Sequence, residues 1–227
     1  MSDSAPEMPE NTWEQQVYRK GNQVNRWPYT AVVSSIMQLL GNGLRAGDRV
    51  LEFGCGTGNN LRFLAEEGFQ AFGIDASETA IELARNQLAE WGLDAQLESG
   101  TFTQLSFSDA SFDLLIDRAA IVHNAYDDIL RALKEAHRVL KPGAHIVSIG
   151  LKGINHPDRI HGTRCGPHTW GNFSAGKFKD TGVTCFLAAE DIEPLFSRFS
   201  NVNWQCHRIF GPCGEIRDEE FEIRARK

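Results

Sequence analysis

Basic residues are few in this chain relative to acidic ones. The 227 residues include 23 lysines and arginines against 30 aspartates and glutamates, which gives a formal net charge of −7. A protein with this balance lacks the basic face that a nucleic-acid backbone requires, so we expect no nucleic-acid partner. No segment approaches the ~20 consecutive apolar residues of a membrane-spanning helix, and residues 1–11 lack the apolar stretch of a signal peptide. These absences predict a soluble, cytoplasmic protein with no membrane partner.

The sequence also lacks a cysteine pattern typical of disulfides or of zinc. Its five cysteines are an odd number, and Cys55 lies inside a glycine-rich turn that a disulfide would distort. Cys206 and Cys213 have the wrong spacing for a zinc knuckle. We therefore expect free thiols in a reducing compartment.

The hydrophobic content is sufficient for one folded domain. With 41% hydrophobic residues, a chain of this length can bury one sizeable core and accommodate modest additions to it. Apolar strand patterns alternate with helical patterns between residues 49 and 149. This order is typical of a doubly wound α/β sheet.

The most informative segment reads RVLEFGCGTGNN at residues 49–60 and is followed by GID at residues 73–75. It predicts a buried strand that ends in three alternate glycines, Gly54, Gly56 and Gly58, then a helix and a second strand. Glycines at such a turn let the backbone approach a ligand, because no β-carbon stands in the way. Asp75 ends the second strand, where a carboxylate can accept both ribose hydroxyls of a nucleoside.

Two residues indicate which nucleoside binds. A dinucleotide fingerprint needs a third glycine in the pattern GxGxxG, but Asn59 stands at that position, so a pyrophosphate site is not supported. Glu52 lies two residues before the first glycine, where its charge would oppose a pyrophosphate and would suit a ligand with an ammonium and a sulfonium group. S-adenosylmethionine is such a ligand.

An ordered series of segments resembles the class I S-adenosylmethionine-dependent methyltransferases of the small-molecule type. The series comprises GCGTG at 54–58, GID at 73–75, LESG at 97–100, SFDLLID at 111–117 and RVLKPG at 138–143. The resemblance implies a Rossmann-like, doubly wound and mostly parallel seven-stranded sheet. It also implies an antiparallel C-terminal hairpin, for which residues 202–210 and 219–225 have the alternating pattern.

Two additions to this domain are expected. Residues 1–40 should form an N-terminal tail, frayed at residues 1–11, and a helical lid, leaving residues 41–227 as the methyltransferase domain. In similar methyltransferases such a segment folds over the cofactor, which makes Tyr18 and Trp27 candidates for the lid; simple packing of these aromatic residues against the sheet is the alternative. A cover of about residues 151–188 is inserted after the fifth strand, where we expect it to enclose the acceptor.

The resemblance implies further cofactor contacts. Thr101 stands where many relatives have an acidic residue that accepts a hydrogen bond from the adenine, and the amide of Phe102 would face the ring; an ordinary loop is the alternative. Asp117 ends the fourth strand, near the expected position of the methionine ammonium. The predicted cofactor contacts are Tyr18, Trp27, Glu52, Gly54, Cys55, Gly56, Gly58, Asn59, Asp75, Ala76, Thr101, Phe102 and Asp117.

No metal is expected. In some methyltransferases an aspartate at the position of Asp117 holds a divalent ion together with an acidic or amide partner after the next strand. The corresponding segment here reads SIGLK at residues 148–152 and contains no such partner. The prediction is therefore a site that functions with S-adenosylmethionine alone.

The resemblance predicts transfer of a methyl group from S-adenosylmethionine to an oxygen or nitrogen of a small-molecule acceptor by in-line displacement. Alignment of the acceptor is then the protein's main task, and a base is needed only for a hydroxyl of high pKa. His123, just after the fourth strand, is the candidate base, with a structural or gating role as the alternative. The further candidates lie in the cover and are His156, His161 and His168.

Two other functions stay open on the sequence. One is a non-catalytic S-adenosylmethionine-binding protein, which would share every cofactor contact. The other is a nicotinamide-dependent oxidoreductase, which Asn59 and Glu52 oppose. The acceptor and the oligomeric state are not indicated by any segment.

Overall fold

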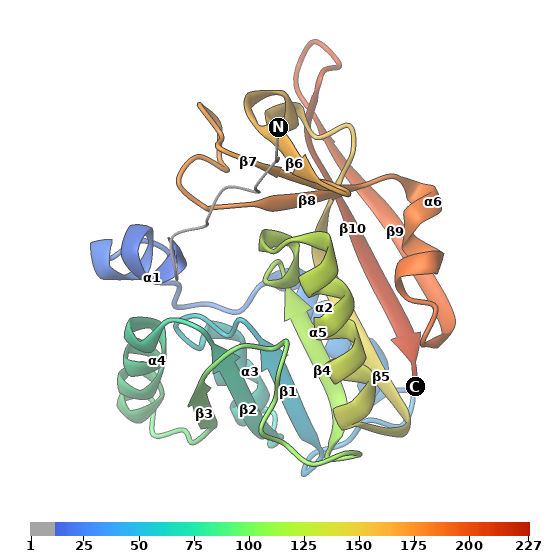
Figure 1. The fold of residues 1–227 in the computed structure, drawn as a ribbon. Coiled ribbons are helices and arrows are strands. Elements are labelled where there is room, and N and C mark those ends of the chain that lie inside the picture. Colours follow the sequence, from blue (N-terminus) through green and yellow to red (C-terminus); the bar gives the residue numbers. More distant parts are fainter. Residues whose placement is uncertain (1–11) are drawn as a thin grey trace.

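A central sheet of seven strands organises the molecule (Figure 1). The computed structural model describes residues 12–227, so the tail predicted at residues 1–11 lies outside the described residues. The strand order is β3-β2-β1-β4-β5-β10-β9, in which β1 to β5 are parallel and β10 pairs antiparallel with β5 and β9. The predicted sheet and its C-terminal hairpin are confirmed. The bounds are β1 (Arg49–Phe53), β2 (Gln70–Asp75), β3 (Gln96–Ser99), β4 (Phe112–Arg118), β5 (Leu140–Gly153), β9 (Ser200–Phe210) and β10 (Ile216–Arg226).

The cover adds three short strands that extend the sheet to ten. They follow the short helix η3 (Pro157–His161) and are β6 (Thr163–Gly166), β7 (Thr169–Gly171) and β8 (Thr184–Leu187). Strand β8 pairs in parallel with Lys152 and Gly153, so β5 extends into the segment predicted as the cover, residues 151–188. Strands β7 and β6 then follow in antiparallel order. Strands of three or four residues give too few alternations to be recognised in a sequence.

Two helices, α2 (Thr30–Leu40) and α3 (Asn59–Glu66), pack on one face of the sheet. Ile36 of α2 and Leu61 of α3 share a buried cluster with Val50 of β1 and Leu114 of β4. Helix α2 therefore belongs to the packed core. The helix α4 (Glu78–Glu90) lies next to β2 and β3 and begins at Ser77, whose hydroxyl accepts a hydrogen bond from the amide of Ala80 at 3.0 Å.

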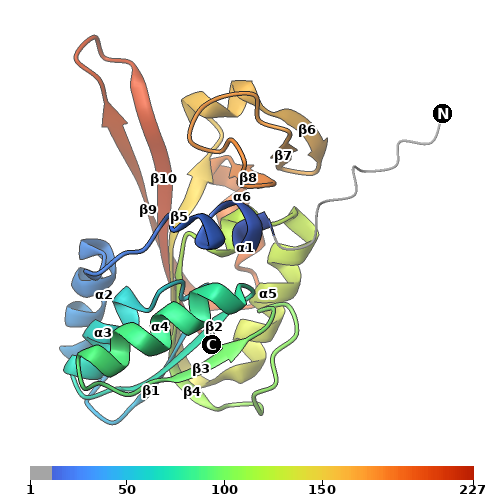
Figure 2. The same ribbon diagram turned by 90° about the vertical axis from the view of Figure 1, so that its left-hand side faces the viewer.

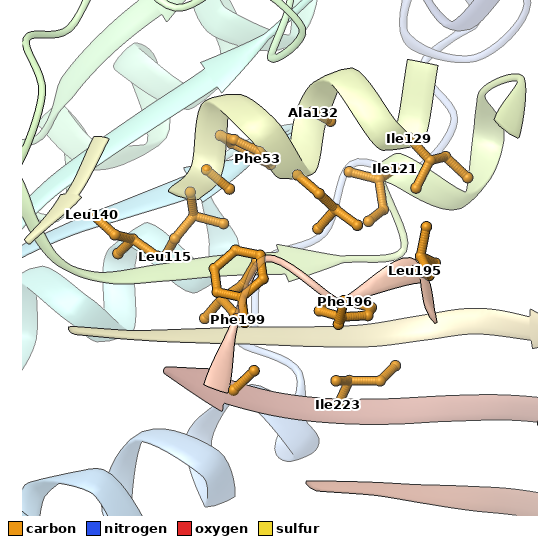
Figure 3. Packing of buried hydrophobic residues seen from close by; sticks show 14 of the residues in the cluster. Phe53, Leu115, Ile121, Ile129, Ala132, Leu140, Leu195, Phe196, Phe199 and Ile223 are labelled. Atoms are coloured by element: carbon orange, nitrogen blue, oxygen red, sulfur yellow. The ribbon is translucent and has the colours of Figure 1, made fainter. Parts of the chain in front are cut away.

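The opposite face is covered by α5 (Tyr126–Val139) and α6 (Ala189–Leu195) (Figure 3). Ile129 and Ala132, three residues apart on α5, point into a cluster with Leu115 of β4, Leu195 of α6 and Ile223 of β10. The three-residue spacing places both side chains on one side of the helix, which is what buries α5 against the sheet. Because β1 to β5 are parallel, their carboxyl ends lie along one edge of the sheet, and the helices on both faces hold the strands in place.

The N-terminal segment lies above this edge. It consists of α1 (Thr12–Gln16) and the short helix η1 (Tyr18–Lys20). In both ribbon views α1 lies between α4 and the cover (Figures 1 and 2). The residues after β4 form the short helix η2 (Ile121–His123) at the same edge. Among residues 12–227, no helix has the length and apolar character needed to cross a bilayer.

Candidate active site

A cavity of about 820 Å³ opens at the carboxyl ends of the parallel strands. It is lined by the turns after β1, β2, β3 and β4, by the start of α5, by the N-terminal part of the chain and by the cover. This volume is in the range of pockets that enclose small-molecule ligands. The cavity is therefore the candidate active site.

Gly54 and Gly56 lie in the turn after β1, where the backbone conformation and the neighbouring side chains leave no room for a β-carbon. Both have positive φ angles, +60° and +52°, which residues with a β-carbon rarely adopt. A β-carbon on Gly54 would lie 2.3 Å from the β-carbon of Ala120, and one on Gly56 would lie 2.8 Å from the hydroxyl of Tyr18. The glycines thus permit close contacts within the protein as well as access to the cavity.

Asp75 is a buried carboxylate that anchors this turn. Its Oδ2 accepts a hydrogen bond from the amide of Gly56 at 2.9 Å, and its Oδ1 accepts one from the amide of Ser77 at 2.9 Å. Burial raises the pKa of Asp75, although the bonds from Ser77 and Gly56 oppose that rise. Each oxygen retains a further lone pair, and Asp75 lines the cavity. The residue can therefore accept hydroxyl groups of a ligand.

Glu52 is a second buried carboxylate, 1% exposed, in the wall of the cavity. Its Oε1 accepts a hydrogen bond of 2.6 Å from Nδ2 of Asn60, whereas its Oε2 has no hydrogen-bond partner in the described part of the chain. Burial raises the pKa of Glu52 to about 8. An unsatisfied buried oxygen is costly, so this position favours a ligand that provides a donor or a positive charge.

Trp13 and Tyr18 form the wall that the N-terminal segment contributes. Burial, with a smaller effect of Asp75, raises the pKa of the Tyr18 phenol, which is therefore neutral. The segment is fastened by Glu14, which accepts hydrogen bonds from the side chains of Ser77 and Thr79. Burial acts to raise the pKa of Glu14, but these bonds and one from Arg19 lower it to about 2.

Trp27 does not line the cavity, although the sequence suggested it for the lid. Its backbone oxygen accepts a hydrogen bond from Nδ2 of Asn59 at 2.9 Å, which holds this part of the chain against α3. The ring is 67% exposed and lies against the guanidinium of Arg62, 4.8 Å from the ring centroid. Trp13, earlier in the chain, occupies the wall instead.

Five other predicted residues do line the cavity, namely Cys55, Asn59, Ala76, Thr101 and Phe102. Thr101 is exposed, and its hydroxyl is 2.8 Å from the hydroxyl of Thr103. The ring of Phe102 stacks on Phe53 of β1, with centroids 5.3 Å apart. Thr101 and Phe102 thus border the cavity at its β3 side.

Asp117 and Gly58 are not brought to the cavity. The carboxylate of Asp117 is fully buried and accepts hydrogen bonds from the amides of Ala120 and Ile121, at 3.0 and 3.1 Å, and from the hydroxyl of Ser148, at 2.6 Å. These bonds shape the turn from β4 into η2. Burial raises the pKa of Asp117 despite them. A β-carbon on Gly58 would lie 3.2 Å from that of Ala84, so Gly58 permits close packing of α3 on α4.

His123 lies at the cover side of the cavity. Its Nδ1 is 3.2 Å from the hydroxyl of Thr184, and its ring lies near those of Trp13 and Phe178, with centroids 5.0 and 6.1 Å away. Burial, helped by the charges of Lys152 and Lys177, lowers the pKa of His123 to about 3. The imidazole is therefore neutral at physiological pH. Among histidines 123–207 of the described chain, the others, including His156, His161 and His168, do not line the cavity.

The cover also contributes residues to the wall of the cavity. Phe178 and the two lysines Lys152 and Lys177 line the cavity. Lys152 lies 2.7 Å from a carboxylate oxygen of Glu220, and both lysines contact Asp218. These ion pairs neutralise the lysines, because the two carboxylates match their charge. Within residues 12–227, no group of three or more histidine, cysteine or acidic side chains is arranged to hold a metal ion.

Comparison with known proteins connects this cavity to a family. A family model described as a methyltransferase domain matches residues 50–143. A demethylmenaquinone methyltransferase of Tropheryma whipplei is 35% identical over 119 residues, which are 52% of this chain and 46% of that protein. A 2-heptyl-1-hydroxyquinolin-4(1H)-one methyltransferase of Mycobacteroides abscessus is 28% identical over 170 residues, which are 74% of this chain and 70% of that protein.

The fold agrees with these matches. A solved S-adenosylmethionine-dependent methyltransferase of Methanosarcina mazei has a TM-score of 0.68 and 24% identity, covering 83% of this chain and 96% of that one. Residues 50–143 thus match a methyltransferase domain, and the fold is that of a solved S-adenosylmethionine-dependent methyltransferase. The matched segment spans about half the length of the Tropheryma whipplei relative, 46%.

The residues of the cavity fit the cofactor of this methyltransferase family. S-adenosylmethionine carries a ribose, which suits the free lone pairs of Asp75, and an ammonium group, which suits the unsatisfied Oε2 of Glu52. Gly54 and Gly56, in the turn beside these two carboxylates, have no β-carbon that could obstruct a ligand. Neither carboxyl group offers the positive charge that the diphosphate of a dinucleotide would need.

Proposed function

We propose that this methyltransferase transfers a methyl group from S-adenosylmethionine to an oxygen or nitrogen of a small-molecule acceptor. The supporting observation is that one cavity contains both carboxylates, Glu52 and Asp75, and a second part formed by His123, Trp13 and Phe178. The first part suits the cofactor and the second part suits an uncharged, flat acceptor. Residues 12–20 and the cover would exclude water from both.

The proposed cofactor contacts follow from this division. Asp75 would accept the ribose hydroxyls, Glu52 the ammonium group, and Thr101 with Phe102 would border the adenine. The bound cofactor supplies an electrophilic methyl carbon. We propose Tyr18 and Trp13 as the lid over these contacts, because both lie in the cavity wall.

The neutral His123 would act on the acceptor. Its imidazole lies in the second part of the cavity and can accept a proton or a hydrogen bond there. Its low pKa makes it a weak base, so it suits an acceptor that loses its proton readily or needs only orientation. The relative that acts on a hydroxyquinolinone is named for an acceptor of this kind. The five free thiols of the chain favour a reducing compartment, and we propose the cytoplasm.

The test of the proposed function is a methyl-transfer assay on a panel of small hydroxylated and amino heteroaromatic compounds. We expect formation of S-adenosylhomocysteine together with a product heavier by one methylene, both detected by mass spectrometry. Tight binding of S-adenosylmethionine without product on any compound would favour the non-catalytic alternative. Binding of NADH in place of S-adenosylmethionine would favour the oxidoreductase.

Replacing His123 with alanine should lower the turnover by about 10²-fold, at the lower end of what general-base catalysis provides, because the base is weak. Binding of S-adenosylhomocysteine should change little, since His123 lies in the acceptor part of the cavity. In the wild type, a pKa of about 3 keeps the imidazole neutral from pH 5.5 to 8. We therefore expect kcat/KM to lack an acidic limb near the ordinary histidine pKa in this range.

The matched control is His161→Ala in the cover, because His161 does not line the cavity. Equal turnover of the His123→Ala variant and the wild type on a true acceptor would leave His123 with a structural role.

A further inference from the structure

Two lysines and two carboxylates form an ion-pair cluster at the cover side of the cavity. Lys152 of β5 lies 2.7 Å from a carboxylate oxygen of Glu220 and 3.3 Å from Oδ1 of Asp218. Lys177 of the cover pairs with Oδ2 of Asp218, and Nε2 of His156 lies 3.4 Å from Oδ1. Both lysines line the cavity, whereas neither carboxylate is among the described residues that do so. The four charges sum to zero, but the cluster presents its positive groups to the cavity.

Lys177 has hydrogen-bond donors available for a ligand. An ammonium group has three N–H donors. In the described part of the chain, the ammonium of Lys177 bonds one acceptor, Asp218, whereas that of Lys152 bonds two, Asp218 and Glu220. The side chain of Lys177 is also 41% exposed, against 8% for Lys152, so it has more freedom to turn towards a ligand. Lys177 is therefore the cation of the cluster that can bind an acceptor.

Phe178 is close to both Lys177 and His123. Nζ of Lys177 lies 5.4 Å from the centroid of the Phe178 ring, and the centroid of the His123 ring lies 6.1 Å from the same point. Burial is the main cause of the low pKa of His123, and the charges of Lys152 and Lys177 are the next largest causes. A positive potential that opposes an imidazolium favours an anion at the same place.

Two carboxylates at the start of α5, Asp127 and Asp128, also line the cavity. Asp127 is exposed, and Asp128 pairs with Arg131 at 2.5 Å. Water screens an exposed charge, and a paired charge is offset by its partner. The potential of the lysines in the acceptor part of the cavity is therefore not cancelled from α5.

We propose that the acceptor is a compound with an acidic hydroxyl group, such as a phenol or an N-hydroxy heteroaromatic, and that the ammonium of Lys177 binds it as its oxyanion. This inference rests on the proposed methyl transfer and selects oxygen over nitrogen as the methylated atom. An oxyanion has three lone pairs, so one can accept a hydrogen bond from Lys177 while another attacks. A charge-assisted hydrogen bond of this kind is about twice as strong as a neutral one.

The charges balance in this scheme. The acceptor enters uncharged and releases its hydroxyl proton to solvent, because the neutral His123 can pass the proton on but does not retain it. The oxyanion then forms a bond to the methyl carbon as the bond from that carbon to sulfur breaks, and the electron pair of the broken bond stays on sulfur. The negative oxygen and the positive sulfur both become neutral. An amine would instead gain positive charge during transfer, which the lysines oppose.

The test uses para-nitrophenol, a flat phenol whose anion absorbs visible light and whose neutral form does not. Its absorbance is titrated against pH on the wild-type protein in the presence of S-adenosylhomocysteine, which cannot donate a methyl group. The pKa of the bound phenol should lie at least about one unit below its value in buffer, which corresponds to about tenfold tighter binding of the anion than of the neutral form. A pKa equal to or above the value in buffer would overturn the proposal, and so would the absence of binding.

Three variants assign the effect to Lys177. Lys177→Met removes the ammonium and keeps the apolar stem, so the pKa of the bound phenol should return to its value in buffer. Lys177→Arg keeps the charge and should keep most of the shift. Lys179→Met is the matched control, because Lys179 is exposed and does not line the cavity, and it should behave as the wild type does. A shift that persists undiminished in Lys177→Met would contradict the proposal.

Methyl-transfer assays on pairs of compounds that carry a hydroxyl or an amino group on the same ring separate this inference from the proposed function. The wild type should show a kcat/KM at least about tenfold higher for the hydroxyl member of each pair. Product from the amino compounds alone would overturn this inference and uphold methyl transfer. A lowered pKa of bound para-nitrophenol without product from any compound would uphold the oxyanion site and overturn the proposed function.

Discussion

Replacing Asp75 with alanine is expected to weaken the binding of S-adenosylhomocysteine by about 100-fold. The loss has two sources. The ribose hydroxyls would lose a charged acceptor, and the amides of Gly56 and Ser77, which now donate to the two carboxylate oxygens, would lose their partner. The glycine-rich turn would then no longer be held in its binding shape. Calorimetry measures the affinity, and thermal unfolding of the ligand-free variant measures the structural part.

Two controls accompany this experiment. Asp94→Ala removes an exposed carboxylate outside the cavity and should leave the affinity unchanged. Asp75→Asn keeps one oxygen acceptor and should fall between the wild type and the alanine variant in stability. A folded Asp75→Ala protein with wild-type affinity would remove Asp75 from the cofactor site.

Replacing Glu52 with glutamine is expected to have effects of opposite sign on binding and on stability. S-adenosylhomocysteine should bind at least about tenfold more weakly, because the ammonium group loses a charged partner. The ligand-free variant should nevertheless be more stable than the wild type at pH 8, since a neutral amide replaces a buried carboxyl with an unsatisfied oxygen.

The raised pKa of Glu52 determines how the stability difference between the variant and the wild type changes with pH. Burial raises the pKa of Glu52 to about 8 from its ordinary value of 4.5, so the unfolded chain releases this proton first as the pH rises. The stabilising contribution of the protonated group is thus fully present below pH 4.5 and is lost as the pH approaches 8. The free energy of unfolding of the variant, relative to that of the wild type, should therefore increase between pH 4.5 and pH 8, by at most about 1.4 kcal/mol per pH unit.

Denaturant unfolding of both proteins at pH 5, 6.5 and 8 measures this difference. Glu98→Gln, at a carboxylate that bonds Ser106 outside the cavity, is the matched control and should show no such trend. A stability difference that stays constant with pH would mean that Glu52 is ionised throughout. Unchanged affinity for S-adenosylhomocysteine would mean that it does not contact the ammonium group.

The parts of the site that are local in sequence could be predicted. The turn at Gly54 and Gly56 and the carboxylate at Asp75 follow from a strand that breaks into alternate glycines and a second strand that ends on an acid. The structure places all three at the cavity. The role of Asp117 could not be inferred in the same way, because three donors within the protein occupy its carboxylate, and two of them come from the turn that follows it.

The parts that depend on distant contacts could not be predicted. Trp13 and Trp27 are both aromatic residues in a segment without periodicity, and the contacts that separate them, such as the bond from Asn59 to the backbone of Trp27, are distant in sequence. The strands of the cover were missed because each has four residues or fewer.

The attachment of Glu14 has a consequence for how ligands enter and leave. Ser77 and Thr79, which donate to this carboxylate, belong to the chain directly after Asp75, so the wall made by Trp13 and Tyr18 is fastened beside the proposed ribose contact. We expect the exchange of spent for fresh cofactor to be slowed by this attachment, because detaching the segment is a local opening with its own free energy. The rate of product release, and with it the maximum rate of the catalytic cycle, would then depend on the hydrogen bonds that hold Glu14 to Ser77 and Thr79.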